Sequence, residues 1–151
     1  MKRILIGLMI FLLCISVAGA STSDSEDDGS LISAADLGYK ILPAESTNND
    51  IGMKSIYDTI TQGETNWHGK IISTYTQTLI INLNWGDTSD SLRLSVYNPS
   101  GSRIGTYYDS ADGTKNGRIK LNIINSNGIE KGTWRYRVYG YSVSGTEDYS
   151  I

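Results

Sequence analysis

The chain of 151 residues, of which 39% are hydrophobic, is long enough for one domain that buries a core of its own. Asp and Glu number 16 against 13 Lys and Arg, which gives a formal net charge of −3, and no block of basic residues interrupts this balance. We therefore exclude nucleic acid as an expected partner, because a phosphate backbone requires a cluster of cations.

The first 20 residues have the features of a secretory signal peptide. Lys2 and Arg3 precede an apolar run over residues 4–17, and residues 18–20 have the small-x-small pattern that signal peptidase cleaves. The run is shorter than the roughly 20 apolar residues that cross a bilayer, so an uncleaved membrane anchor is the less favoured alternative. Cleavage would remove Cys14, the one cysteine, and leave 11 basic against 16 acidic residues. We expect a secreted protein, extracellular or associated with the cell envelope, with no membrane span, no disulfide and no thiolate metal site.

A spacer and one domain are expected to follow this leader. Residues 21–37 begin with STSDSEDDGS, which holds four acidic residues and no aromatic or aliphatic one, and this composition predicts an acidic, flexible spacer. The remaining residues, 38–151, are about as many as one small β-sandwich requires. We expect them to form a single domain.

Alternation of apolar and polar residues is the main pattern of residues 77–141. Four segments show it: QTLIINLNW, SLRLSVY, GRIKLNI and GTWRYRVYGY. Successive side chains of a strand point to opposite faces, so each segment predicts a strand with one buried and one solvated face. Short segments rich in Gly, Asn, Asp and Ser separate them, as reverse turns require. The sequence therefore predicts an all-β fold, an antiparallel β-sandwich of jelly-roll type.

Few residues of the sequence point to catalysis. His68 is the single histidine and lies in TNWHGKII, which has the pattern of a strand start, so we expect a structural or surface residue rather than a catalytic base. Three carboxylate pairs lie in predicted turns, where Asp usually bonds to the backbone two residues on: Asp87 with Asp90, Asp109 with Asp112, and Glu147 with Asp148. We expect no catalytic residue and no enzyme. A small hydrolase that uses His68 is the alternative with the least support.

Ten tyrosines against one phenylalanine are the most unusual feature of the composition. Tyrosine combines an apolar ring with a polar tip, which suits a binding surface. Alternation along residues 132–141 would place four large side chains on the solvated face of one strand: Arg135, Arg137, Tyr139 and Tyr141. We nominate these four as a ligand-binding patch. Ordinary cross-strand pairing on a solvated sheet is the alternative.

Four motifs of the chain are AESTNND, ITQGETNWHGKI, SLRLSVYNPSG and GTWRYRVYGYSVSGTEDYSI. In this order they resemble the bacterial and archaeal pre-peptidase C-terminal (PPC) domain, a jelly-roll module of secreted proteases and collagenases, over about residues 44–151. The resemblance implies an accessory module, which in that family is attached to a catalytic domain. We expect a free-standing secreted copy here, because leader, spacer and module fill the chain.

The resemblance also implies calcium ligands. The opening loop of the family and its Asp-aromatic segment map onto four residues of this chain: Glu45, Asn48, Asp50 and Asn66. Asn66 stands where the family has an aspartate, and Ser91 and Arg93 replace two more acids in another of the motifs. Calcium affinity depends on the charge of the ligands, so we expect weak calcium binding or no cofactor.

Together these features predict a secreted, non-catalytic accessory or binding module that attaches to an extracellular polymer or partner protein, either glycan or polypeptide. Such a module would act through aromatic contacts and a few hydrogen bonds. A structural component of the cell envelope that packs against a neighbouring protein is the alternative.

Overall fold

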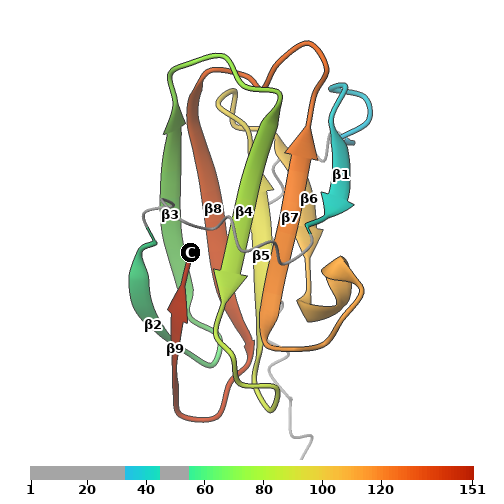
Figure 1. Cartoon of the computed structure of the whole chain (residues 1–151). Helices are drawn as coiled ribbons and strands as arrows, with labels where there is room; N and C mark the ends of the chain where they lie inside the picture. The colour runs from blue at the N-terminus through green and yellow to red at the C-terminus, as the bar shows by residue number, and fades with distance from the viewer. Residues whose placement is uncertain (1–32, 45–54) are drawn as a thin grey trace, which may run out of the picture.

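Nine strands and one short 3-10 helix make up the regular structure of residues 33–44 and 55–151, the part of the chain that this computed structural model describes (Figure 1). In chain order they are β1 (Lys40–Pro43), β2 (Tyr57–Thr61), β3 (Thr65–Ile72), β4 (Thr78–Asn84), β5 (Ser91–Tyr97), β6 (Arg103–Tyr107), η1 (Asp109–Asp112), β7 (Arg118–Ile124), β8 (Gly132–Ser142) and β9 (Thr146–Ser150). No helix within these residues is long and apolar enough to cross a membrane. The predicted signal peptide, residues 1–20, lies outside the described part of the chain.

The strands form two antiparallel sheets that pack against each other. One sheet has the order β1-β7-β4-β9-β2 and the other the order β3-β8-β5-β6, and Figure 1 shows them as two layers. Apart from the β5–β6 hairpin, every connection from β2 onward crosses from one sheet to the other. This is the strand order of a jelly roll, with β1 added at the edge next to β7. The expected fold class, an antiparallel β-sandwich of jelly-roll type, is confirmed.

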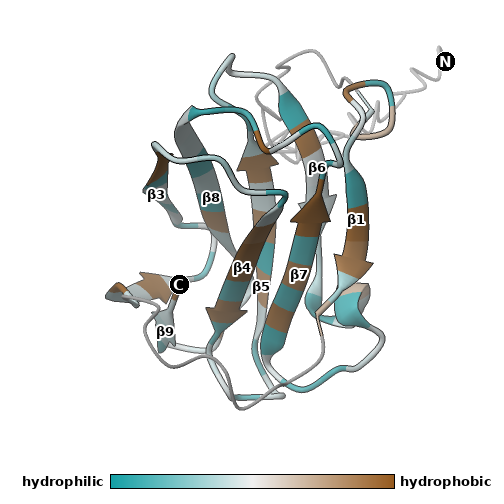
Figure 2. Ribbon diagram, turned by 45° about the horizontal axis from the view of Figure 1, so that its top comes forward, coloured by the Kyte–Doolittle hydropathy of each residue, from teal (hydrophilic) through white to brown (hydrophobic). Residues whose placement is uncertain are grey.

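The hydrophobic core lies between the sheets, on the inward side of the strands that alternation predicted. Leu79, Ile81 and Leu83 of β4 are at most 2% exposed, and Figure 2 shows hydrophobic and hydrophilic residues alternating along the neighbouring β7. Trp134 of β8 is fully buried, and Tyr39 packs edge-on against it with ring centroids 5.5 Å apart. Burial of such side chains is the main source of stability in a fold of this size.

Strand β5 departs from the predicted alternation of a buried and a solvated face. Its outward-facing residues Arg93, Ser95 and Tyr97 are only 7%, 3% and 5% exposed. β5 lies between β8 and β6, whose side chains cover this face. The expectation of a solvated face is therefore wrong for β5, because burial there depends on neighbouring strands rather than on the sequence of β5 itself.

Packing begins before the expected domain boundary at residue 38. β1 pairs with β7 from Lys40 to Pro43, and Ala34 and Leu37 pack against the core although they fall in the predicted spacer, residues 21–37. These two side chains are apolar, so their burial contributes to the core. Residues 21–32 of the predicted spacer lie outside the described part of the chain.

The five-stranded sheet is nearly divided between β4 and β9. Strands β2 and β9 pair along their whole length, from Tyr57 with Ser150 to Thr61 with Thr146. Strands β4 and β9 pair only at Asn84 and Ser150, while β4 pairs with β7 over its full length. The β2–β9 pair is thus joined to the rest of its sheet at a single pair of residues.

Candidate functional site

The outer face of the four-stranded sheet gathers arginine and aromatic side chains from all four strands. Alternation along β8 buries Trp134, Tyr136 and Val138 and turns the residues between them outward. The register places outward residues of β3, β5 and β6 beside them, because residues directly opposite each other share a face. We call this surface the Arg/aromatic face, and it comprises Trp67, Arg93, Tyr97, Arg103, Arg135, Arg137, Tyr139 and Tyr141.

Two guanidinium groups of this face lie over aromatic rings. Cζ of Arg93 is 4.5 Å from the centroid of the Tyr139 ring, and Cζ of Arg135 is 4.4 Å from the Trp67 ring. The Trp67 ring also contacts Tyr97, with centroids 5.2 Å apart. A cation–π contact of this kind fixes the position of a guanidinium group without cancelling its charge. The rings therefore act as supports that hold the arginines in place.

Exposed rings lie at two places along β8. Trp67 is 42% exposed and lies opposite Arg137, and Tyr141 is 50% exposed. Tyr108, which follows β6, packs edge-on against Tyr141 with ring centroids 5.2 Å apart. Since strand residues rise by about 3.3 Å each, the four residues from Arg137 to Tyr141 separate the two exposed ring sites by about 13 Å. A ligand that contacts both sites must be an extended molecule.

The Arg/aromatic face has an excess of hydrogen-bond donors. Among the described residues, Oη of Tyr97 and Nε of Arg103 and Arg137 are buried and have no hydrogen-bond partner. No described carboxylate lies within 4.0 Å of a nitrogen of Arg103, Arg135 or Arg137. The four strands β3, β8, β5 and β6 contain no Asp or Glu at all. The terminal Nη groups of Arg135 and Arg137 bond to no described residue either, so an anion can accept from them.

The four residues nominated from the sequence lie together on this face. Arg135 and Tyr141 are exposed, while Arg137 and Tyr139 are half-buried. Sequence reasoning missed the four further members of the face, because they join it only through pairing with β8 or β5: Trp67, Arg93, Tyr97 and Arg103. That the face binds a ligand stays a prediction.

His68 belongs to a hydrogen-bond network that links the two sheets. Its Nε2 lies 2.6 Å from Oη of the buried Tyr149, and that hydroxyl donates to Asp58 at 3.3 Å. Asn66 donates from Nδ2 to the same hydroxyl at 3.1 Å. Burial lowers the pKa of His68, and the nearby Asp58 opposes this effect only in part. The partners of His68 are thus a tyrosine and an aspartate on the opposite sheet, which fits a structural histidine.

Of the four residues nominated as calcium ligands, only Asn66 is among the described residues. The Nδ2 of Asn66 also donates to the carbonyl oxygen of Thr59 at 2.8 Å. The other three nominated ligands, Glu45, Asn48 and Asp50, lie outside the described residues. The four-residue calcium site therefore stays a prediction from the resemblance.

Two carboxylates of the predicted turns, Asp87 and Asp112, bond to the backbone two residues on, as expected. Asp87 accepts a hydrogen bond from the amide of Ser89 at 2.8 Å, and Asp112 accepts one from Thr114 at 3.2 Å. Oδ1 of the buried Asp109 accepts from three successive amides, those of residues 116–118, each at 3.1 Å. These acids fix connections between strands.

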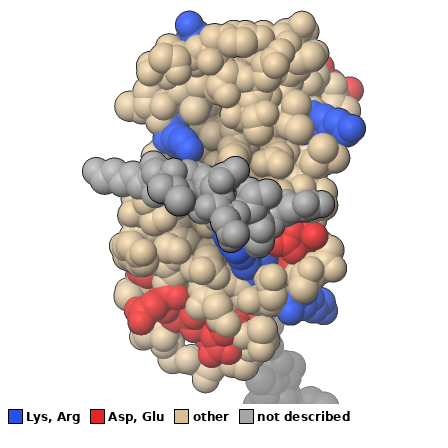
Figure 3. Space-filling model, viewed as in Figure 1, with Lys and Arg blue, Asp and Glu red and all other residues tan. Residues whose placement is uncertain are grey.

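A group of acids lies at one end of the sandwich, where the β4–β5 and β8–β9 connections meet. Carboxylate oxygens of Asp87, Asp90 and Glu147 lie within 4.8 Å of one another, and Figure 3 shows acidic side chains gathered at this end. Burial raises the pKa of Glu147 to about 7, and the neighbouring Asp90, Asp87 and Asp148 add to the effect. These oxygens are of the type that Ca²⁺ prefers. Exposed acids also gather without an ion, so the cluster by itself does not define a metal site.

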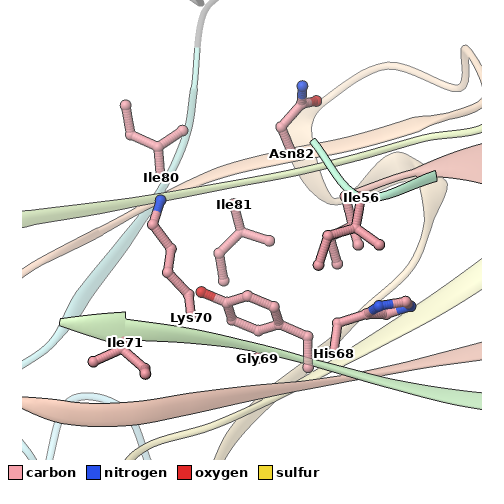
Figure 4. A pocket seen from close by; sticks show the side chains of 10 residues that line it. Ile56, His68, Gly69, Lys70, Ile71, Ile80, Ile81 and Asn82 are labelled. Atoms are coloured by element: carbon pink, nitrogen blue, oxygen red, sulfur yellow. The ribbon is translucent and has the colours of Figure 1, made fainter. Parts of the chain in front are cut away.

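A pocket of about 540 Å³ lies where β4 and β9 diverge. Figure 4 shows His68 and Lys70 entering it from β3, with Ile81 and Asn82 of β4 on the facing side. Half of its lining residues are isoleucine, and none of the described residues that line it is Ser, Cys, Asp or Glu. The pocket therefore gives His68 neither a nucleophile nor a second acid. It could not be foreseen from the sequence, because strands far apart in the chain enclose it.

The chain is similar in sequence to a known protein. No family model matches the chain. An uncharacterized protein of Archaeoglobus fulgidus is 36% identical over 62 residues, which make up 41% of this chain and 87% of that protein.

Proposed function

We propose that this chain, which belongs to the same family as that uncharacterized archaeal protein, is a secreted, non-catalytic binding module that attaches to an extracellular polymer or partner protein. The observation that carries the proposal is the Arg/aromatic face, where four arginines and four aromatic side chains meet on strands that contain no acid. Interfaces of proteins are enriched in arginine, tyrosine and tryptophan. The resemblance to the accessory PPC domain supports the same role.

The surroundings of His68 support a non-catalytic function. A base in acyl transfer needs a nucleophile within hydrogen-bond reach. The contacts of His68 are instead Tyr149 and Asp58, which hold the sheets together. Loss of any hydrolytic activity on replacement of His68 by Ala would count against this part of the proposal.

Removal of the Tyr139 and Tyr141 rings should abolish retention of the purified protein on cell-envelope or matrix material. Tyr141 is exposed, and Tyr139 supports Arg93 by a ring contact, so the double variant Tyr139→Ala/Tyr141→Ala loses contact area and positioning together. Retention is measured by sedimentation with the insoluble material. The matched control is Tyr57→Ala, because Tyr57 is 83% exposed on β2 of the other sheet.

The thermal unfolding of each variant is measured alongside, so that lost retention is compared only between folded proteins. Unchanged retention of the double variant would remove this face from consideration. Release by soluble glycan or peptide is expected for a binding module. Persistent co-purification with the envelope during such competition would favour the structural role instead.

A further inference from the structure

We infer that the ligand of the Arg/aromatic face is an anionic polysaccharide, one whose sugar units carry carboxylate or sulfate groups; this inference rests on the proposed function.

The positive charge of the arginines on this face favours an anionic ligand. No described carboxylate lies within 4.0 Å of Arg103, Arg135 or Arg137, and the four strands of the sheet supply none. Buried Nε atoms of Arg103 and Arg137 have no hydrogen-bond partner among the described residues, and neither has Oη of Tyr97. Carboxylate and sulfate oxygens can accept two parallel hydrogen bonds from one guanidinium group. Such groups can accept from the terminal Nη groups of Arg135 and Arg137, which bond to no described residue.

Exposed rings on the face fit sugars. A pyranose unit presents C–H groups on its flat side, which pack on an aromatic ring, while its acidic substituent projects from the rim. Trp67 of β3 and Tyr141 of β8 carry exposed rings, and their backbone positions are about 13 Å apart along the strand direction, with Tyr139 and Arg93 opposite each other between them. A polysaccharide strand can therefore contact both rings while its acidic groups reach the arginines.

The position of the face disfavours an acidic peptide. One common mode of peptide binding adds a strand to the free edge of a sheet. The centre of the Arg/aromatic face lies on β8, whose backbone is already paired with β3 on one side and β5 on the other. Nucleic acid is disfavoured by the formal net charge of −3 and by the acids at one end of the molecule, since its dense phosphates would meet overall repulsion.

The test is retention of the purified protein on three immobilised polysaccharides: polygalacturonate with carboxylates, dextran sulfate with sulfates, and neutral dextran. We expect retention on at least one of the first two, release by rising NaCl, and no retention on dextran. The double variant Arg135→Gln/Arg137→Gln should bind roughly tenfold more weakly. The control Lys40→Gln/Lys115→Gln removes the same charge from the exposed Lys40 of β1 and Lys115 before β7, and should bind as the unchanged protein does.

The possible outcomes of this experiment distinguish failure of the inference from failure of the proposed function. Retention on polygalacturonate alone or on dextran sulfate alone supports the inference and identifies the acidic group. Equal retention on dextran, equal losses in the two double variants, or tighter retention on polyglutamate or single-stranded DNA would overturn it. In each of those cases the proposed function stands as long as Tyr139→Ala/Tyr141→Ala loses retention on envelope material. If that variant also keeps its retention, the proposed function fails as well.

Discussion

Glu147 lies beside Asp87 and Asp90 at the end of the sandwich, and burial together with these neighbours raises its pKa to about 7 from an ordinary value of 4.5. The folded protein therefore holds a proton that the unfolded chain releases as the pH rises above 4.5. Between these two values the free energy of unfolding must fall as the pH rises, and the loss is complete once Glu147 ionises in the folded state. His68 acts in the opposite sense, because its lowered pKa reduces stability as the pH falls through the ordinary value of 6.5.

Replacement of Glu147 by Gln should make the protein more stable at about pH 8 and leave its stability unchanged at about pH 4. Gln has the shape of the protonated side chain, so the two proteins differ only where wild-type Glu147 tends to ionise. The measurement is the free energy of unfolding from urea denaturation across this pH range. A variant whose stability curve runs parallel to that of wild type would show that Glu147 has no such coupling to folding.

Strand β8 is the element on which the four-stranded sheet depends. It pairs with β3 and β5, buries Trp134 in the core and supplies half of the residues of the Arg/aromatic face. The β2–β3 turn also bonds to it, because the Gly63 amide donates to the carbonyl oxygen of Gly140 at 2.8 Å and the Gly140 amide donates to the carbonyl oxygen of Glu64 at 3.0 Å. This close approach requires glycine, since a Cβ at residue 140 would overlap the carbonyl oxygen of Thr61.

The substitution Gly140→Ala should therefore destabilise the protein by about 1–3 kcal/mol, as overpacking usually does. The matched control is Gly69→Ala on β3, where an added Cβ would lie 3.4 Å from the nearest atom, the carbonyl oxygen of Trp134. Chemical denaturation of the two variants measures the difference. Equal stability of both variants would contradict the steric argument.

Alternation predicted the strands that are amphipathic by themselves. The segments that contain β4, β7 and β8 each carry a strong period-two pattern, and β8 also gave four members of the face. Burial of Arg93 and Tyr97 on β5, and the meeting of Tyr97 with Trp67 and Arg103, depend on which strands become neighbours. Pairing between segments distant in the chain leaves no local periodicity. The sequence therefore predicted the members of the face that lie on β8, but not those that β3, β5 and β6 contribute.

At the scale of the whole molecule, the β2–β9 pair is attached to the sandwich by fewer backbone pairings than the other strands are. The β2–β9 pair is joined to its own sheet only at Asn84 and Ser150. Its other contacts cross the core to the other sheet, above all the 2.6 Å hydrogen bond between Oη of Tyr149 and Nε2 of His68. A unit with few such ties can open without unfolding the remainder.

Amide hydrogen exchange should be faster in β2 and β9 than in β4 and β7. The variant Tyr149→Phe removes the tie to His68, so it should speed exchange in β2 and β9 by about tenfold while leaving β4 and β7 nearly unchanged. The control Tyr141→Phe removes an exposed hydroxyl from the end of β8 and should change neither. Uniform acceleration over all four strands would show instead that the sandwich opens as one unit.

The stacking of Arg93 on Tyr139 and of Arg135 on Trp67 has a consequence for binding entropy. A free arginine side chain loses rotamer freedom when a ligand orders it, and this loss reduces affinity. On this face two guanidinium groups are already held by rings before any ligand arrives, and both rings lie on strands paired within the sheet. Ordering of these side chains thus takes place during folding, so an approaching anion meets a surface that is organised in advance.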